Sequence, residues 1–67
     1  MSGRLEALEA RARAAIAAGD WTSAADTFAE LAALRPDDTR VWANLARAQI
    51  KGGRSAETAL RRALVLA

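Results

Sequence analysis

The stretch AAIAAGDWTSAADTF, residues 14–28, places a tryptophan directly after a glycine and an aspartate, between two alanine-rich runs. Alanine is the best helix former, so both runs predict helices. Gly19 suits the left-handed backbone conformation that ends a helix, because glycine has no Cβ. The stretch therefore predicts a corner between two helices. The role of Trp21 at that corner depends on the rest of the chain.

The composition predicts one small domain with a thin core. The chain has 67 residues, and 19 of them are Ala, whose methyl groups bury little surface. A domain of this size also buries a smaller fraction of its surface than a larger one does. Helices that lie close together around few large side chains are therefore expected.

Helix breakers stand at residues 19–20, 36–38 and 52–53 and divide the chain into four segments. Apolar residues recur at spacings of three and four within each segment, which is the period of a helix face and not of a strand. The expected helices cover about residues 4–18, 22–34 and 39–51, and a fourth follows a Ser55 cap. Asp37 or Asp38 is expected to cap the third helix. Connections this short make successive helices antiparallel.

Each expected helix has one apolar face that is predicted to point into the core. The predicted inward residues are Leu5, Leu8, Ala12, Ala15, Ile16, Ala24, Ala25, Phe28, Leu31, Ala32, Trp42, Leu45, Ala46, Gln49, Ile50, Ala56, Ala59, Leu60, Ala63 and Leu64.

The chain contains an internal repeat. When Gly19 is aligned with Gly53, the first helix falls on the third, and Ala12 falls on Ala46. The second helix falls on the fourth when Phe28 is aligned with Leu60, which requires a slightly smaller shift. The second corner is therefore shorter than the first, and it has no counterpart of Trp21.

A helix-turn-helix unit of about 34 residues resembles the tetratricopeptide repeat. The residues that carry this resemblance are Ala12, Gly19, Asp20, Trp21, Ala24, Phe28, Leu31, Leu34 and Pro36 in the first unit, and Trp42, Leu45, Ala46, Gly53, Ala56, Leu60, Ala63 and Leu64 in the second. Arg11, Ala15 and Gln49 depart from the family pattern. The resemblance implies an all-α fold of four antiparallel helices as two stacked repeats in a single domain, 1–67, with units at about 5–38 and 39–67. An ordinary alanine-rich four-helix bundle is the alternative.

The resemblance also implies that the chain binds a protein or peptide, in a groove lined by the first helix of each unit. The positions that match the family's groove are Glu9, Arg13, Ala17, Arg40, Asn44, Arg47 and Lys51. Glu9 and Arg13 do not fit the subfamily that clamps a terminal carboxylate. The basic face of the third helix suits an acidic peptide, although every surface helix also needs a solvated polar face.

Two repeats are fewer than the three or so that usually form a stable array. The last helix adds an apolar set that consists of Leu60, Leu64, Val65 and Leu66. Self-association of this end as a homodimer is therefore expected. Docking on another protein, or membership of a longer or designed array, are the alternatives.

The remaining features argue against catalysis and cofactors. The chain has no Cys, His or Tyr, and Asp37-Asp38 is typical of a turn and helix cap, so neither an enzyme nor a metal or cofactor site is expected. The net charge is +2 with Arg and acidic residues interspersed, and Arg61-Arg62 is the one doublet, which disfavours nucleic acid as a partner. No signal peptide or membrane segment is predicted, and a cytoplasmic location is expected.

Overall fold

The computed structural model describes residues 3–67, which form four α-helices and contain no strand. Met1 and Ser2, which belong to the stretch where no signal peptide is predicted, lie outside the described residues. The helices are α1 (Gly3–Ala17), α2 (Trp21–Leu34), α3 (Thr39–Lys51) and α4 (Glu57–Leu66). The predicted all-α class and the four helices are confirmed.

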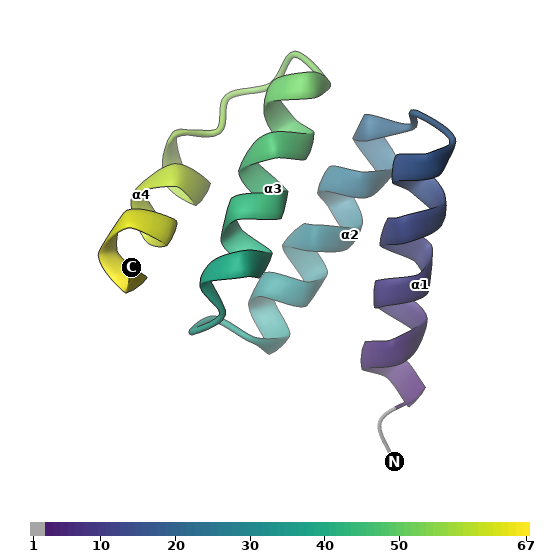
Figure 1. Cartoon of the computed structure of the whole chain (residues 1–67), viewed down its shortest axis with the longest axis horizontal. Coiled ribbons are helices and arrows are strands. Elements are labelled where there is room, and N and C mark those ends of the chain that lie inside the picture. Colours follow the sequence, from purple (N-terminus) through teal and green to yellow (C-terminus); the bar gives the residue numbers. More distant parts are fainter. Residues whose placement is uncertain (1–2) are drawn as a thin grey trace.

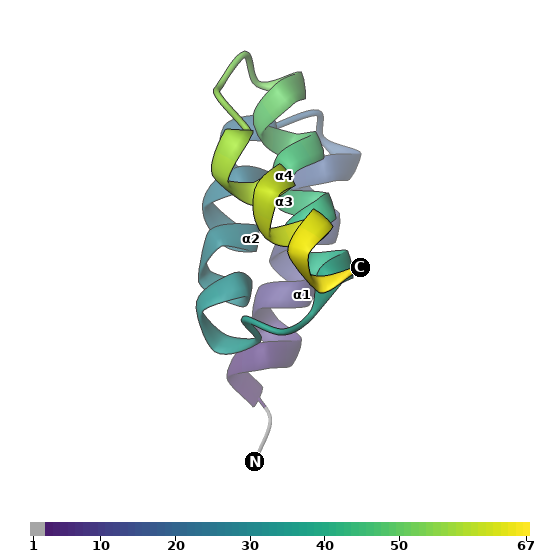
Figure 2. The same ribbon diagram turned by 90° about the vertical axis from the view of Figure 1, so that its left-hand side faces the viewer.

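Each helix packs against the one before it, so α2 lies between α1 and α3, and α3 lies between α2 and α4 (Figure 1). The Cα atoms extend over 29 × 27 × 13 Å, and the thin dimension is seen when the molecule is turned on its side (Figure 2). The four helices therefore form a slab with α1 at one edge and α4 at the other. Only α2 and α3 have a helix on both sides.

The first corner combines three features that end α1 and start α2. Gly19 has a φ of 71°, and the following N–H of Asp20 donates to the carbonyl of Ala15 at 2.8 Å. The Asp20 carboxylate accepts a hydrogen bond from the Ser23 N–H at 3.2 Å, which caps the start of α2. Hydrogen bonding to Ser23 lowers the pKa of Asp20 below its ordinary 3.8, with the larger effect from the Ser23 side chain and the smaller one from its backbone N–H. Trp21 is the first residue of α2.

The second corner ends its helix in the same way but starts the next one differently. Gly53 has a φ of 76°, and the N–H of Arg54 donates to the carbonyl of Gln49 at 2.7 Å. The predicted Ser55 cap is wrong: the N-cap of α4 is Ala56, which has no side chain to accept the hydrogen bond. Residues 54–56 instead span the gap from α3 to α4, and Arg54 reaches Asp26 on α2 at 3.4 Å.

The middle corner is held by both a cap and a tryptophan. Asp38 is the N-cap of α3 and accepts from the Arg40 N–H at 3.0 Å, which resolves the choice between Asp37 and Asp38. The indole N–H of Trp42 donates to the carbonyl of Pro36 at 2.8 Å. This bond satisfies the polar atom of a half-buried ring and ties α3 to the turn that precedes it.

The core is thin, as the composition predicts. Its buried apolar residues number 13, and nine of them are Ala. The four larger side chains are Leu8, Phe28, Leu31 and Leu45. Small residues allow the helices to lie close together, but they bury little apolar area, so each large core side chain carries a sizeable share of the stability.

Three residues predicted to point inward are exposed. Ile50 is 58% exposed, Leu60 46% and Leu64 76%. Neighbouring helices cover α3 near Ala46 and Ala48, and Ile50 lies outside those covered faces. The two leucines are exposed because α4 is an edge helix, and a periodic pattern does not reveal which face lacks a neighbour.

Candidate functional site

A groove of about 310 Å³ opens between α1, α2 and α3. Its apolar surface comes from side chains on all three helices, among them Ile16 on α1, Phe28 and Leu31 on α2, and Val41 on α3. Its polar lining consists of Glu9, Arg13, Arg35, Asp38, Arg40 and Asn44. A concave site with an apolar base and a few polar groups is the usual form of a binding site.

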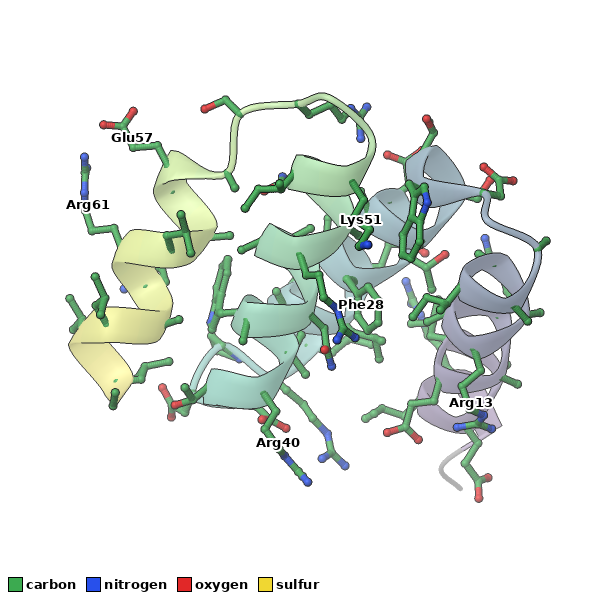
Figure 3. All side chains as sticks on the ribbon, turned by 45° about the horizontal axis from the view of Figure 1, so that its top comes forward. Arg13, Phe28, Arg40, Lys51, Glu57 and Arg61 are labelled. Atoms are coloured by element: carbon green, nitrogen blue, oxygen red, sulfur yellow. The ribbon has the colours of Figure 1, made fainter. Side chains whose placement is uncertain are left out.

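Helix α2 forms the floor of the groove because it lies between its two neighbours. Phe28, near the middle of α2, is only 7% exposed and fills the space between α1 and α3. Figure 3 shows Arg13 on α1 and Arg40 on α3 on the two sides of Phe28. The walls of the groove therefore carry long cationic side chains, whereas the floor is aromatic and aliphatic.

The α3 wall of the groove is cationic. This helix, TRVWANLARAQIK, contains Arg40, Arg47 and Lys51 and no acidic residue. Asp38, just before the helix, lies 3.9 Å from Arg35 and 3.8 Å from Arg40, so one carboxylate serves two guanidinium groups. The Arg40 side chain is 90% exposed, which leaves its guanidinium accessible to a partner.

The structure gathers most, but not all, of the predicted binding residues at the groove. Arg13, Arg40 and Asn44 line it. Arg47 lies one turn further along and donates to the Asn44 side-chain oxygen at 3.2 Å. Lys51 is at the far end of α3, where its Nζ lies 5.5 Å from the centre of the Trp21 ring.

Arg35 and Val41 also line the groove, and the sequence did not single them out as site residues. Arg35 directly precedes Pro36, and this position indicated only the end of a helix. Val41 follows the Asp38 cap closely, and in sequence it resembles any apolar residue of α3. Both reach the groove because the short middle corner brings the end of α2 beside the start of α3.

The predicted self-association residues lie on α4, and most of them are exposed. Leu60, Leu64 and Val65 are 46%, 76% and 71% exposed, whereas Leu66 is half-buried. On the same helix Arg61 pairs with Glu57 at 3.0 Å, and Figure 3 shows both at the edge of the molecule, far from the groove. The Arg62 guanidinium lies 5.7 Å from the centre of the Trp42 ring. The arginine doublet is thus divided between two intramolecular contacts.

Within residues 3–67 there is no cluster of three or more His, Cys, Asp or Glu side chains placed to hold a metal ion. In the same part of the chain, no helix combines the length and the apolar character that crossing a bilayer requires.

A family model described as the tetratricopeptide repeat matches residues 15–64. The match begins near the end of α1 and runs through α2 and α3 into α4, so it includes all three corners. Neither the curated proteins nor the solved structures include a match to the chain.

Proposed function

The chain belongs to the tetratricopeptide repeat family, and we propose that it binds an acidic peptide segment of a partner protein in the groove between α1, α2 and α3. Repeats of this family are protein-interaction modules in general and are typically not enzymes. The single observation that carries the proposal is the groove itself, which joins an apolar floor to a polar lining in which three arginines outnumber two carboxylates. We further propose that the chain binds without catalysis and acts in the cytoplasm, in keeping with its lack of cysteine.

The apolar floor accounts for affinity. Ile16 and Val41 are half-buried and retain apolar surface that a partner side chain can cover. Burial of apolar surface contributes about 25 cal/mol per Å² before the cost of association is subtracted. A partner with one or two large apolar side chains in the bound segment is therefore expected.

The cationic walls account for the preference for acidic segments. Arg13 and Arg40 face the groove from opposite helices, so a bound carboxylate can accept charge-assisted hydrogen bonds from either side. Asn44 offers both a donor and an acceptor to a peptide backbone. Arg47 holds the Asn44 side chain, and Lys51 extends the positive charge along α3.

We propose to test this function with synthetic peptides of matched length that carry one leucine flanked by acidic, neutral or basic residues. Fluorescence anisotropy with the wild-type chain is expected to show the tightest binding for the acidic series. The double variant Arg13→Glu/Arg40→Glu should lose that binding and prefer the basic series, because it reverses the net charge of the groove lining from positive to negative. Each lost contact of this kind is worth about a tenfold change in Kd or more.

Arg61→Glu is the control, because it makes one substitution of the same type at the α4 edge of the molecule, away from the groove. It is expected to leave peptide binding unchanged. Equal binding of all three peptide series, or an equal loss with Arg61→Glu, would show that the groove does not select its ligand. A strong salt dependence with DNA in place of peptide would favour a nucleic acid as the partner.

Self-association through α4 is the second part of the proposal. The observation that favours it is the exposure of large apolar side chains on this helix, with Leu60, Leu64 and Val65 accessible and Leu66 beside them. Covering such side chains is favourable, at about 1.5–3 kcal/mol for a side chain that becomes fully buried. Sedimentation velocity over a range of concentrations measures it, and a chain that stays monomeric throughout would contradict it.

A further inference from the structure

One face of α2 packs on α3. This contact joins the first helix pair, α1 and α2, to the second pair, α3 and α4. This face contains Trp21, Ala25, Phe28 and Ala32, at spacings of four, three and four. The Trp21 Cβ is 3.4 Å from the place that a Cβ on Gly52 would occupy, and Phe28 shares the groove with Val41 of α3. Ala25 and Ala32 are 1% and 2% exposed.

The same face recurs on α4, but no helix within residues 3–67 covers it. The alignment of α2 with α4 places Ala25, Phe28 and Ala32 on Glu57, Leu60 and Leu64. All three residues of α4 are exposed. Leu60 keeps a large apolar side chain at the position of Phe28, and Leu64 is larger than the alanine that it matches. The α4 edge thus repeats a face that the chain buries elsewhere.

The face of α3 that receives α2 has a counterpart on α1. That face consists of Val41, Leu45 and Ala48 on α3 and Gly52 just after it, and the alignment of the two helices places Ala7, Arg11 and Ala14 of α1 and the following Ala18 at the same positions. These four residues are exposed at the other edge of the slab. The three alanines leave room beside α1, and α4 can fill that room because it carries Leu64 where α2 has only an alanine.

The charges on the two edges are also complementary. Arg11 stands where α3 has a buried leucine, and Glu57 stands where α2 has a buried alanine. If α4 of one copy packed on α1 of another as α2 packs on α3, Glu57 and Arg11 would lie on facing helices, about one helical turn apart. The present partners are Glu30 at 3.9 Å for Arg11 and Arg61 at 3.0 Å for Glu57, and these pairs are exposed, so exchanging them costs little.

We propose that the α4 edge of one copy packs on the α1 edge of a second copy, as α2 packs on α3 within one chain. The contact is heterologous, so copies add head to tail and the assembly does not close at two. This inference rests on the self-association part of the proposed function and specifies the surface that receives α4. Groove binding is independent of it.

The geometry distinguishes this arrangement from a twofold pair of α4 helices. Val65, at 71% exposed, is almost as accessible as Leu64, but it aligns with Ala33, which is exposed within the chain and is not covered by α3. Head-to-tail packing therefore buries Leu64 and leaves Val65 exposed. The second corner also lacks the tryptophan that closes the α2–α3 contact, so association is expected to be weaker than the packing within the chain.

The test is sedimentation velocity and light scattering on the whole chain across about three decades of concentration up to about 1 mM, a range suited to weak association. The average mass of the wild type should keep rising past that of a dimer. Leu64→Glu and Ala14→Arg should each lower the association constant by about tenfold or more, because the first places a charge in an apolar contact and the second fills, with a long side chain, the room beside α1 that α4 needs.

Two matched controls make the same substitutions nearby. Val65→Glu lies beside Leu64 on α4, and Ala17→Arg lies on the side of α1 that corresponds to Lys51. Both should assemble like the wild type. Far-UV circular dichroism confirms that each variant is folded, and Ala7→Arg replaces Ala14→Arg if that variant is not.

A mixture of Leu64→Glu and Ala14→Arg distinguishes head-to-tail packing from twofold pairing. Leu64→Glu retains a working α1 edge and Ala14→Arg retains a working α4 edge, so an equimolar mixture should form a one-to-one dimer that does not grow further. Loss of assembly with Leu64→Glu but not with Ala14→Arg would show twofold pairing of α4 and overturn the inference alone. A wild type that stays monomeric would overturn both the inference and self-association, while the peptide-binding test of the groove would still stand.

Discussion

Helices α2 and α4 carry the same sequence pattern, yet they occupy very different surroundings. Phe28 on α2 is 7% exposed, and its counterpart Leu60 on α4 is 46% exposed. Ala32 and Leu64 differ even more, at 2% and 76%. Neighbours on both sides cover α2, whereas α4 has one neighbour. In a stacked repeat, burial thus depends on position in the stack as much as on sequence.

The two corners show the same contrast at the level of single residues. Gly19 and Gly53 both have positive φ angles and end their helices alike. Only the first corner continues with an aspartate cap and a tryptophan, and within residues 3–67 that tryptophan has a further helix, α3, to pack against.

The largest expected effect is the difference between Phe28→Ala and Leu60→Ala. Truncating the buried phenylalanine should cost about 3–5 kcal/mol, which is most of the stability of so small a domain. Truncating the exposed leucine should cost about 1 kcal/mol or less. Urea denaturation followed by circular dichroism measures both.

Phe28→Leu serves as a milder variant at the same site, because it gives α2 the residue that α4 carries, and it should remain folded with a loss of about 1 kcal/mol. Equal losses for Phe28→Ala and Leu60→Ala at low concentration would mean that α4 is covered as well as α2, and the contrast between the two helices would be lost.

The next effect concerns the tryptophan of the first corner. Trp21→Ala should lower the free energy of unfolding by about 2 kcal/mol, because the half-buried ring packs at the end of α3 and lies beneath the Lys51 ammonium. The comparison variant is Arg54→Ala at the second corner. Its exposed ion pair with Asp26 should be worth less than about 1 kcal/mol. Thermal and urea unfolding of the two variants should rank them in this order, and the reverse order would assign the anchoring of α3 to the second corner.

The smallest effect is a pH dependence confined to the first corner. Hydrogen bonds from Ser23 hold the pKa of Asp20 below 3.8, so the folded chain binds this proton more weakly than the unfolded chain does. The contribution of the carboxylate is therefore fully present above this ordinary value and is lost as the pH falls through the lowered folded value. Asp20→Asn keeps an acceptor at the cap but does not titrate.

The wild type should accordingly lose stability relative to Asp20→Asn when the pH is lowered below about 4, and urea denaturation at a series of pH values measures the difference. The other carboxyl groups are shared by both proteins and cancel in this comparison. A difference that stays constant with pH would show that Ser23 does not favour the charged form of Asp20.

Much of the candidate groove could be predicted because the resemblance to the tetratricopeptide repeat assigns the groove to the first helix of each unit. Arg13, Arg40 and Asn44 line it as expected from their positions on the first helix of each unit. Arg35 escaped prediction because it belongs to the floor helix, and only the turn at Pro36 brings it to the groove. Lys51 was assigned to the groove by its spacing, but it lies over Trp21 because the end of α3 meets the first corner.

The sequence by itself determined the helices, their corners and the family, because propensity, capping and the repeat spacing are local properties that few residues can satisfy. Only the tertiary structure decided which apolar faces are covered. Leu60 and Leu64 recur at the spacing of a core-facing helix side, yet both are exposed. Burial requires a second surface, and α4 lies at the edge of the slab. The uncovered α4 and α1 edges are therefore a consequence of packing, and the proposed head-to-tail contact follows from them.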